Sequence, residues 1–204
     1  MTKMLNGVIC FGDSVIFGTG ASSRSCGCGR VLRSLLQVPV LIKGRNNDTS
    51  RDGLRRLRSD VLNRDGYSHV IILFGNNDCR LFDVDTPNID SRKYKENIIK
   101  MIHAIKEKGK DPFISNLQPI TSSGFTKSLP QMKQLMKNIK SPSDWHKSYS
   151  DALKEIAQVC NVKLVDIFNV LKSRMPNVIC EDGLHPNDLG HKIIAEEFKK
   201  ALVK

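Results

Sequence analysis

The sequence predicts an α/β fold, a three-layer α/β/α sandwich whose centre is a flavodoxin-like, five-stranded parallel sheet with helices on both faces. Short apolar segments alternate with amphipathic segments along the whole chain, which is the pattern of successive β-α-β units. Most of these apolar segments are continuous runs, as expected for parallel strands buried on both faces. Right-handed crossovers leave few topologies for such a chain.

The five apolar segments are rich in Val, Ile and Phe, and Gly12 and Gly75 stop the first and the third. The third segment is the strongest because it holds five consecutive apolar residues. The predicted strands cover residues 8–11, 39–42, 70–74, 112–115 and 162–165.

Between the strands, apolar residues recur at spacings of three and four, which predicts helices with one buried face. Pro186 suits the first position of the last helix, because proline has no N–H to leave unpaired there. These apolar stripes are interpreted as core faces and not as binding sites. The predicted helices cover residues 31–36, 54–62, 94–105, 149–160 and 186–203.

The 204 residues suit one domain covering residues 1–204, with an unusually long connection at residues 117–144. This connection contains Pro119, Pro130 and Pro142 and a short helical patch, which indicates a lid, a substrate-binding insertion or a mobile loop. Trp145 follows it, and a packing anchor is favoured over a pocket-shaping role.

Composition excludes several classes of protein. The net charge is +11, but the basic residues are spread over predicted helix faces without a nucleic-acid motif, so no nucleic-acid partner is expected. No apolar run approaches the ~20 residues of a membrane span. Residues 1–7 lack the apolar segment of a signal peptide, which predicts a cytoplasmic protein. The oligomeric state is left open.

The six cysteines are expected to be free thiols, because most stand singly in or beside apolar segments. Cys26 and Cys28 form a C-x-C pair without the further ligands of a zinc site. We therefore expect no metal and no organic cofactor.

Three polar clusters follow the first three predicted strands. They are Gly12-Asp13-Ser14, Asn46-Asn47-Asp48 and Gly75-Asn76-Asn77-Asp78. In open parallel sheets, ligands bind beyond the carboxyl ends of the strands, so these clusters are expected to converge on one site. Asp13 and Asp78 are interpreted as residues that hold turns or cap helices.

Asp182 and His185 lie three residues apart near the C-terminal end of the chain. A carboxylate that accepts from one ring nitrogen fixes the tautomer of a histidine and stabilises its protonated form. The pair therefore supplies a base and its orienting group, and a nucleophile would have to come from elsewhere. On its own, this spacing is common in surface turns.

Taken together and in order, these blocks resemble the SGNH hydrolases, also called the GDSL esterase/lipase family. Gly12-Asp13-Ser14 matches the nucleophile block, with Val15 in place of leucine, and the other matches are Gly75-Asn76-Asn77-Asp78 and Asp182-Gly183-Leu184-His185. The α/β-hydrolase elbow G-x-S-x-G is absent because Ile16 stands at its last position. A dinucleotide fingerprint is absent as well.

The resemblance implies a catalytic triad of Ser14, Asp182 and His185. Ser14 would attack an ester carbonyl, His185 would remove its proton, and Asp182 would orient His185. The oxyanion would be held by the backbone N–H of Ser14, the backbone N–H of Asn47 and the side-chain amide of Asn77.

Asn47 departs from the family pattern, because it stands where a glycine is usual before Asp48-Thr49. Asn enters the left-handed backbone region more readily than most residues, so the backbone donor is expected to survive. Its side chain is expected to narrow the acyl pocket.

The predicted function is a serine esterase that hydrolyses short acyl esters, with an O-acetyl carbohydrate esterase as the preferred subtype. The expected partner is a small-molecule ester. The alternatives are an acyltransferase on the same site, a lysophospholipase or thioesterase, and a catalytically silent binding module. A decayed site would be expected to lack Ser14, Asn77, Asp182 or His185, and all four are present.

Overall fold

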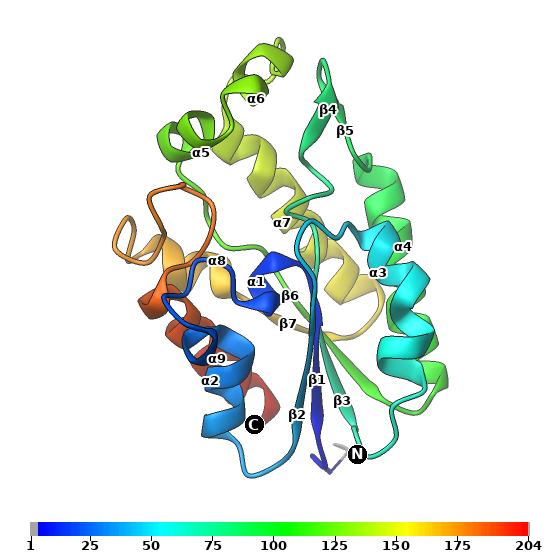
Figure 1. The fold of residues 1–204 in the computed structure, drawn as a ribbon. Helices are drawn as coiled ribbons and strands as arrows, with labels where there is room; N and C mark the ends of the chain where they lie inside the picture. Colours follow the sequence, from blue (N-terminus) through cyan, green and yellow to red (C-terminus); the bar gives the residue numbers. More distant parts are fainter. Residues whose placement is uncertain (1–3, 204) are drawn as a thin grey trace.

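A five-stranded parallel sheet lies at the centre of the computed structural model, which describes residues 4–203 (Figure 1). The strand order is β2-β1-β3-β6-β7, which is the flavodoxin-like order when the sheet's own strands are counted along the chain. The predicted fold class is therefore confirmed. Residues 1–3, part of the segment on which the signal-peptide prediction rests, lie outside the described residues.

All five predicted strands are confirmed, each within two residues of its predicted ends. They are β1 (Val8–Gly12), β2 (Val40–Gly44), β3 (His69–Leu73), β6 (Asp111–Ser115) and β7 (Lys163–Val165). Gly12 pairs in register with Gly44 on one side and with Leu73 on the other, so the first three strands end at one level. The polar clusters that follow these strands therefore meet at the same edge of the sheet.

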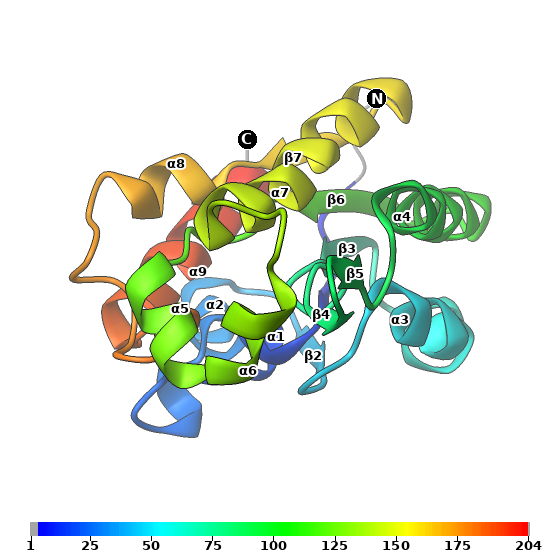
Figure 2. The same ribbon diagram turned by 90° about the horizontal axis from the view of Figure 1, so that it is seen from above.

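Helices cover both faces of the sheet, as Figure 2 shows from above. One layer consists of α3 (Ser50–Leu57), α4 (Ser91–Glu107) and α7 (Pro142–Val159), with a π-helical turn, Arg58–Leu62, continuing α3. The other consists of α1 (Ser14–Phe17), α2 (Cys28–Leu35), α8 (Ile167–Lys172) and α9 (Asp188–Leu202), with a 3-10 turn at Arg24–Cys26.

Capping residues explain why several helices begin away from the predicted positions. The Asp90 side chain accepts from Lys93 N, and the Ser141 side chain accepts from Asp144 N, so α4 and α7 start earlier than their apolar stripes. The last helix starts later than predicted, because Asn187 caps it by accepting from Gly190 N. Pro186 therefore lies before the helix and not at its first position, and that prediction was wrong.

Residues 117–144 fold into α5 (Ser122–Ser128) and α6 (Pro130–Leu135) and lead into α7. They pack with a small hairpin, β4 (Leu81–Asp83) and β5 (Thr86–Pro87), above the carboxyl ends of the strands (Figure 1). The hairpin and the short helices α1 and α8 carry no clear periodicity, and the sequence did not predict them. This part of the fold has its own buried apolar cluster of Leu81, Ile120, Phe125 and Met132.

Trp145 lies between this small cluster and the main core, and its Nε1–H donates to the carbonyl of Cys79 at 2.8 Å. It does not line the cavity described below, in agreement with its interpretation as a packing anchor. All six cysteines are free thiols, as predicted.

A buried arginine ties the ends of the first two strands to helix α3. Arg56 is only 7% exposed, and its Nη2 donates to the carbonyl of Gly12 at 2.9 Å while its Nη1 donates to the carbonyl of Lys43 at 3.0 Å. Two carboxylates neutralise the guanidinium, with Nε 2.6 Å from Asp48 Oδ2 and Nη1 2.9 Å from Asp60 Oδ2. Asp48 directly follows Asn47, so this ion pair also holds the second polar cluster.

Arg56→Met should lower the free energy of unfolding by about 3–5 kcal/mol, because it removes a buried donor that two carboxylates and two carbonyls share. Asp60 keeps Lys43, and the carbonyl of Gly12 keeps the backbone N–H of Arg45. Although burial acts to raise the pKa of Asp60, hydrogen bonds from Arg56 and Lys43 hold it below its ordinary value. The stability that ionised Asp60 contributes is therefore present at neutral pH and is lost as the pH falls through the folded-state pKa of Asp60. Urea denaturation at pH 7 and at acidic pH measures both effects.

The matched control is Arg55→Met, because Arg55 is exposed and pairs with Asp52 at the surface. Its cost should stay below about 1 kcal/mol. If Arg56→Met does not fold, Arg56→Lys can be measured in its place, because lysine keeps the charge but lacks the planar fork of arginine. Its loss of unfolding free energy should lie between those expected for Arg55→Met and Arg56→Met. Equal losses of unfolding free energy in Arg55→Met and Arg56→Met would contradict the structural role of Arg56.

Candidate active site

Ser14 stands at the first turn of α1, immediately after β1. The chain can turn there because Gly12 has no side chain: a Cβ at this position would lie 2.3 Å from the carbonyl oxygen of Leu73. Asp13 caps the short helix, with its Oδ1 accepting from Val15 N at 3.0 Å. These features hold the Ser14 hydroxyl at the carboxyl edge of the sheet.

Asp182 and His185 share one tight turn, in which Gly183 takes the left-handed conformation with φ +70°. Asp182 Oδ1 accepts from the backbone N–H groups of Leu184 and His185, both at 2.9 Å, and Oδ2 lies 2.6 Å from His185 Nδ1. Burial acts to raise the pKa of Asp182, but the hydrogen bonds from the His185 side chain and the two backbone groups hold it below its ordinary value. Asp182 therefore stays ionised and fixes the ring of His185.

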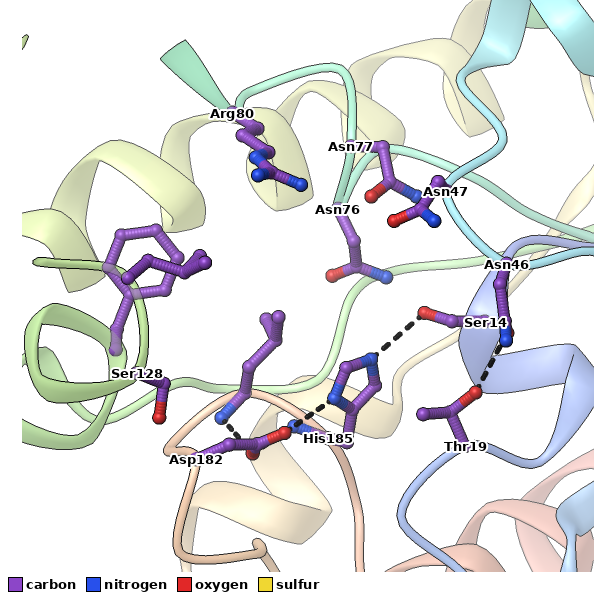
Figure 3. Close-up of a pocket in the computed structure, with 13 residues that line it drawn as sticks. Ser14, Thr19, Asn46, Asn47, Asn76, Asn77, Arg80, Ser128, Asp182 and His185 are labelled. Carbon is purple, nitrogen blue, oxygen red and sulfur yellow. Dashed lines mark hydrogen bonds and ion pairs between the residues drawn. The ribbon is translucent and has the colours of Figure 1, made fainter. Parts of the chain in front are cut away.

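The structure brings this pair against Ser14, as Figure 3 shows. His185 Nε2 lies 3.1 Å from Ser14 Oγ, across 171 positions of sequence. A hydroxyl, an imidazole and a carboxylate thus follow one another within hydrogen-bonding distance. In this order, a neutral imidazole can take a proton from the hydroxyl while the carboxylate stabilises the charge that forms.

Asn47 and Asn77 line the cavity beside Ser14. Asn47 adopts φ +63°, the left-handed conformation expected for this position. The Asn77 side chain donates one amide hydrogen to the carbonyl of Asp48 at 2.9 Å, which fixes the orientation of the amide and leaves its second hydrogen for another acceptor.

A buried polar network lies behind Ser14. Asn76 Nδ2 donates to Asp13 Oδ2 at 2.9 Å, and Asn76 Oδ1 lies 2.9 Å from Gln118 Nε2 and 2.8 Å from His146 Nε2. Burial raises the pKa of Asp13 to about 6 and lowers the pKa of His146 to about 4. Neutral His146 can therefore donate from Nε2, and Gln118 also donates to the carbonyl of Leu184, beside His185.

Asp78 holds the start of helix α3. Its carboxylate accepts from Ser50 N at 3.1 and 2.9 Å and from the Ser50 hydroxyl, which in turn accepts from Asn97 Nδ2 at 2.9 Å. Burial raises the pKa of Asp78 to about 7, although the Ser50 hydrogen bonds oppose the shift. Both Asp13 and Asp78 thus hold loops, in agreement with their interpretation from the sequence.

The cavity has a volume of about 260 Å³, and all five predicted site residues line it. The sequence missed several other lining residues. Arg80 follows the third polar cluster after one residue, which was a usable signal, whereas Phe125, Ser128 and Leu129 fall in the 117–144 segment that was marked as a possible substrate-binding insertion. Gln118 and His146 lie behind the cavity and gave no signal of their own.

The GDSL-like lipase/acylhydrolase family matches residues 10–193 of the chain. An uncharacterized lipoprotein of Bacillus subtilis (strain 168) is 24% identical over 169 residues, covering 78% of this chain and 69% of that protein. Within residues 4–203, no helix is long and apolar enough to cross a membrane. Cytoplasmic location stays a prediction.

Solved structures show the same fold. A putative lipolytic protein of the G-D-S-L family from Desulfitobacterium hafniense superimposes with a TM-score of 0.77 at 20% identity, covering 97% of this chain and 99% of that one. A mutant of an acetyl-xylooligosaccharide esterase from Geobacillus Stearmophilus gives a TM-score of 0.76 at 21% identity, covering 98% and 94%. The matched region contains each of the sequence blocks described above, and the chain belongs to the GDSL-like lipase/acylhydrolase family as a hydrolase of carboxylic ester bonds.

Proposed function

We propose that the protein is a serine esterase that hydrolyses short acyl esters, preferably acetyl esters, through Ser14, His185 and Asp182. The observation that carries this proposal is the hydrogen-bonded line from Ser14 Oγ through His185 to Asp182 at the wall of the cavity. Ser14 comes from the first turn of α1 and the other two groups come from one C-terminal turn, and further hydrogen bonds hold both segments.

In the first half of the reaction, Ser14 Oγ attacks the ester carbonyl and His185 Nε2 takes the hydroxyl proton. The tetrahedral intermediate collapses when His185 gives this proton to the alcohol oxygen, which leaves an acyl group on Ser14. Water then attacks the acyl-enzyme with His185 again as base, and the carboxylic acid departs. Asp182 keeps the ring of His185 oriented throughout.

Three donors are available to the oxyanion. Within residues 4–203, the backbone N–H groups of Ser14 and Asn47 have no hydrogen-bond acceptor, and the Asn77 amide has one hydrogen to spare. Such donors act where charge develops in the transition state, and losing one typically costs about 3 kcal/mol of transition-state stabilisation. The left-handed backbone of Asn47 supports this role, because it replaces the glycine that is usual there.

The polar surroundings of Ser14 support a short acyl group. Thr19, Asn46 and Asn47 line the cavity beside it, and Thr19 Oγ1 donates to Asn46 Oδ1 at 2.8 Å. A long alkyl chain placed against these groups would remove them from water without replacing their hydrogen bonds. The similarity to an acetyl-xylooligosaccharide esterase supports an O-acetylated carbohydrate as the substrate class.

A fluorophosphonate probe should label the native protein and should fail to label Ser14→Ala, because the probe reacts with an activated serine hydroxyl. Labelling is read by intact-protein mass spectrometry. The matched control is Ser59→Ala, whose hydroxyl lies on the π-helical turn and donates to the carbonyl of Arg56. Equal labelling of the native protein and Ser14→Ala would remove Ser14 as the nucleophile.

His185→Ala should lower kcat for nitrophenyl acetate by about 10³-fold or more, since the hydroxyl loses its base. The exposed His103 provides the control, and His103→Ala should keep native turnover. Unchanged circular dichroism and thermal midpoint would show that both variants are folded. A loss of less than tenfold for His185→Ala would mean that another group serves as the base.

Nitrophenyl acetate should be cleaved with a higher kcat/KM than nitrophenyl octanoate, because the Asn47 side chain narrows the acyl pocket. Asn47→Gly keeps the left-handed backbone and its N–H while removing that side chain. The variant should therefore shift the acetate-to-octanoate ratio toward octanoate by about tenfold. A native preference for octanoate would contradict the short-acyl proposal while leaving the triad in place.

A further inference from the structure

One charged group in the cavity takes no part in the chemistry described above. Arg80 is partly buried and lines the cavity together with Ser14 and His185. Within residues 4–203, no hydrogen bond or ion pair engages its guanidinium. The other charged residue in the lining, Asp182, is occupied by His185 and by two backbone N–H groups. The cavity thus carries a positive charge that the described part of the chain does not neutralise.

The backbone on either side of Arg80 is held in place. The Arg80 carbonyl accepts from Asn88 N at 2.9 Å, and the Asp78 carbonyl accepts from Ile89 N at 3.1 Å. The Asn88 side chain also donates to the carbonyl of Asn77 at 2.8 Å. Arg80 is therefore attached to the same fixed loop as Asn77, and its guanidinium extends toward the cavity (Figure 3).

The position of Arg80 shows which part of an ester it would meet. In Figure 3, Arg80 and Ser128 lie away from Ser14 and Asn46, toward the other end of the cavity, and Asn76 lies between Arg80 and His185 in this view. The proposed acyl group lies beside Ser14 among Thr19, Asn46 and Asn47, so the alcohol part would extend toward the other end of the cavity. Arg80 lies toward that other end, so it would face the alcohol part and not the acyl part.

We propose that Arg80 binds a carboxylate on the alcohol part of the ester, so that the substrates are short acyl esters of acidic alcohols. This inference rests on the proposed esterase function. The planar fork of arginine matches a carboxylate with two parallel hydrogen bonds. Phe125, Leu129 and Leu184 line the same cavity and supply apolar contacts for the carbon skeleton between the ester and the acid.

A carboxylate fits better than a phosphate monoester. Arg80 is the one cationic side chain among the described residues that line the cavity, so a single negative charge is matched and a doubly charged group is not. The net charge of +11 also favours acidic substrates, because a positively charged surface raises their local concentration at low salt.

The test compares kcat/KM for 3-acetoxybenzoate with that for 3-acetoxybenzamide, its neutral analogue. The native protein should prefer the carboxylate by about 10- to 100-fold, as expected for charge-assisted hydrogen bonds in a partly buried site. Arg80→Gln should reduce this ratio to about one, and Arg80→Lys should give an intermediate ratio because it keeps the charge without the fork. The native preference should also weaken as salt is raised.

The matched control is Arg58→Gln, which removes the same charge from an exposed position on the π-helical turn. It should keep the native ratio. If Arg80→Gln lowered kcat/KM equally for both substrates, Arg80 would have a merely structural role and the proposal would be overturned. A native ratio near one, or a stronger preference for 3-acetoxyphenyl phosphate, would overturn it as well.

Failure of this inference can be told apart from failure of the esterase proposal. If nitrophenyl acetate is hydrolysed and Ser14 is labelled while the carboxylate preference is missing, the carboxylate site is wrong and the esterase remains. If no ester is hydrolysed, calorimetric binding of 3-hydroxybenzoate to the native protein and to Arg80→Gln still tests the site. Equal affinity of the two proteins for this acid would overturn the role of Arg80.

Discussion

The guanidinium of Arg56 is the interaction on which the arrangement of the site depends. It binds the carbonyl of Gly12, one residue before the capping Asp13, and the carboxylate of Asp48, one residue after Asn47. A buried arginine is costly unless its donors are satisfied, and here two carboxylates and two carbonyls satisfy them while the ring of Phe11 lies 4.4 Å away. The same cost restricts movement of the loops after β1 and β2, because a shift of either loop would leave the buried guanidinium of Arg56 without one of its acceptors.

A second constraint sets the two halves of the site against each other. Gln118 donates to Asn76 Oδ1 and to the carbonyl of Leu184, so one amide group links the polar network behind Ser14 to the turn that carries His185. Because two donors meet at Asn76 Oδ1, its Nδ2 must face Asp13, and Asp13 must accept. The direction of every hydrogen bond in this network is fixed, and the network links the loop of Ser14 to the turn of His185 although 171 positions of sequence lie between these two residues.

The sequence predicted the sheet and the residues at its carboxyl edge, because both follow from local rules. Apolar runs, two of them stopped by glycine, predicted the strands, and the polar clusters after the first three predicted where Ser14, Asn47 and Asn77 would meet. It did not predict Gln118 or His146, because a buried hydrogen bond between distant residues leaves no periodic signal. Nothing in the sequence set Arg56 apart from the other basic residues of the predicted helix faces, since the carbonyls of Gly12 and Lys43 that it binds come together only after β1 and β2 pair.

The groups proposed to react and the groups proposed to select the substrate come from different parts of the fold. The proposed reacting groups are anchored to strand ends and to a turn braced against the main core, where displacement would disturb Arg56 or the Asn76 network. The far wall of the cavity comes from the β4–β5 hairpin region and from residues 117–144, which bury a small apolar cluster of their own. Side chains such as Arg80, Phe125 and Leu129 can therefore change without unpairing the sheet or uncovering a buried charge. In this fold, the stability of the sheet constrains the positions of Ser14 and His185, and it leaves the wall that carries Arg80, Phe125 and Leu129 free to vary.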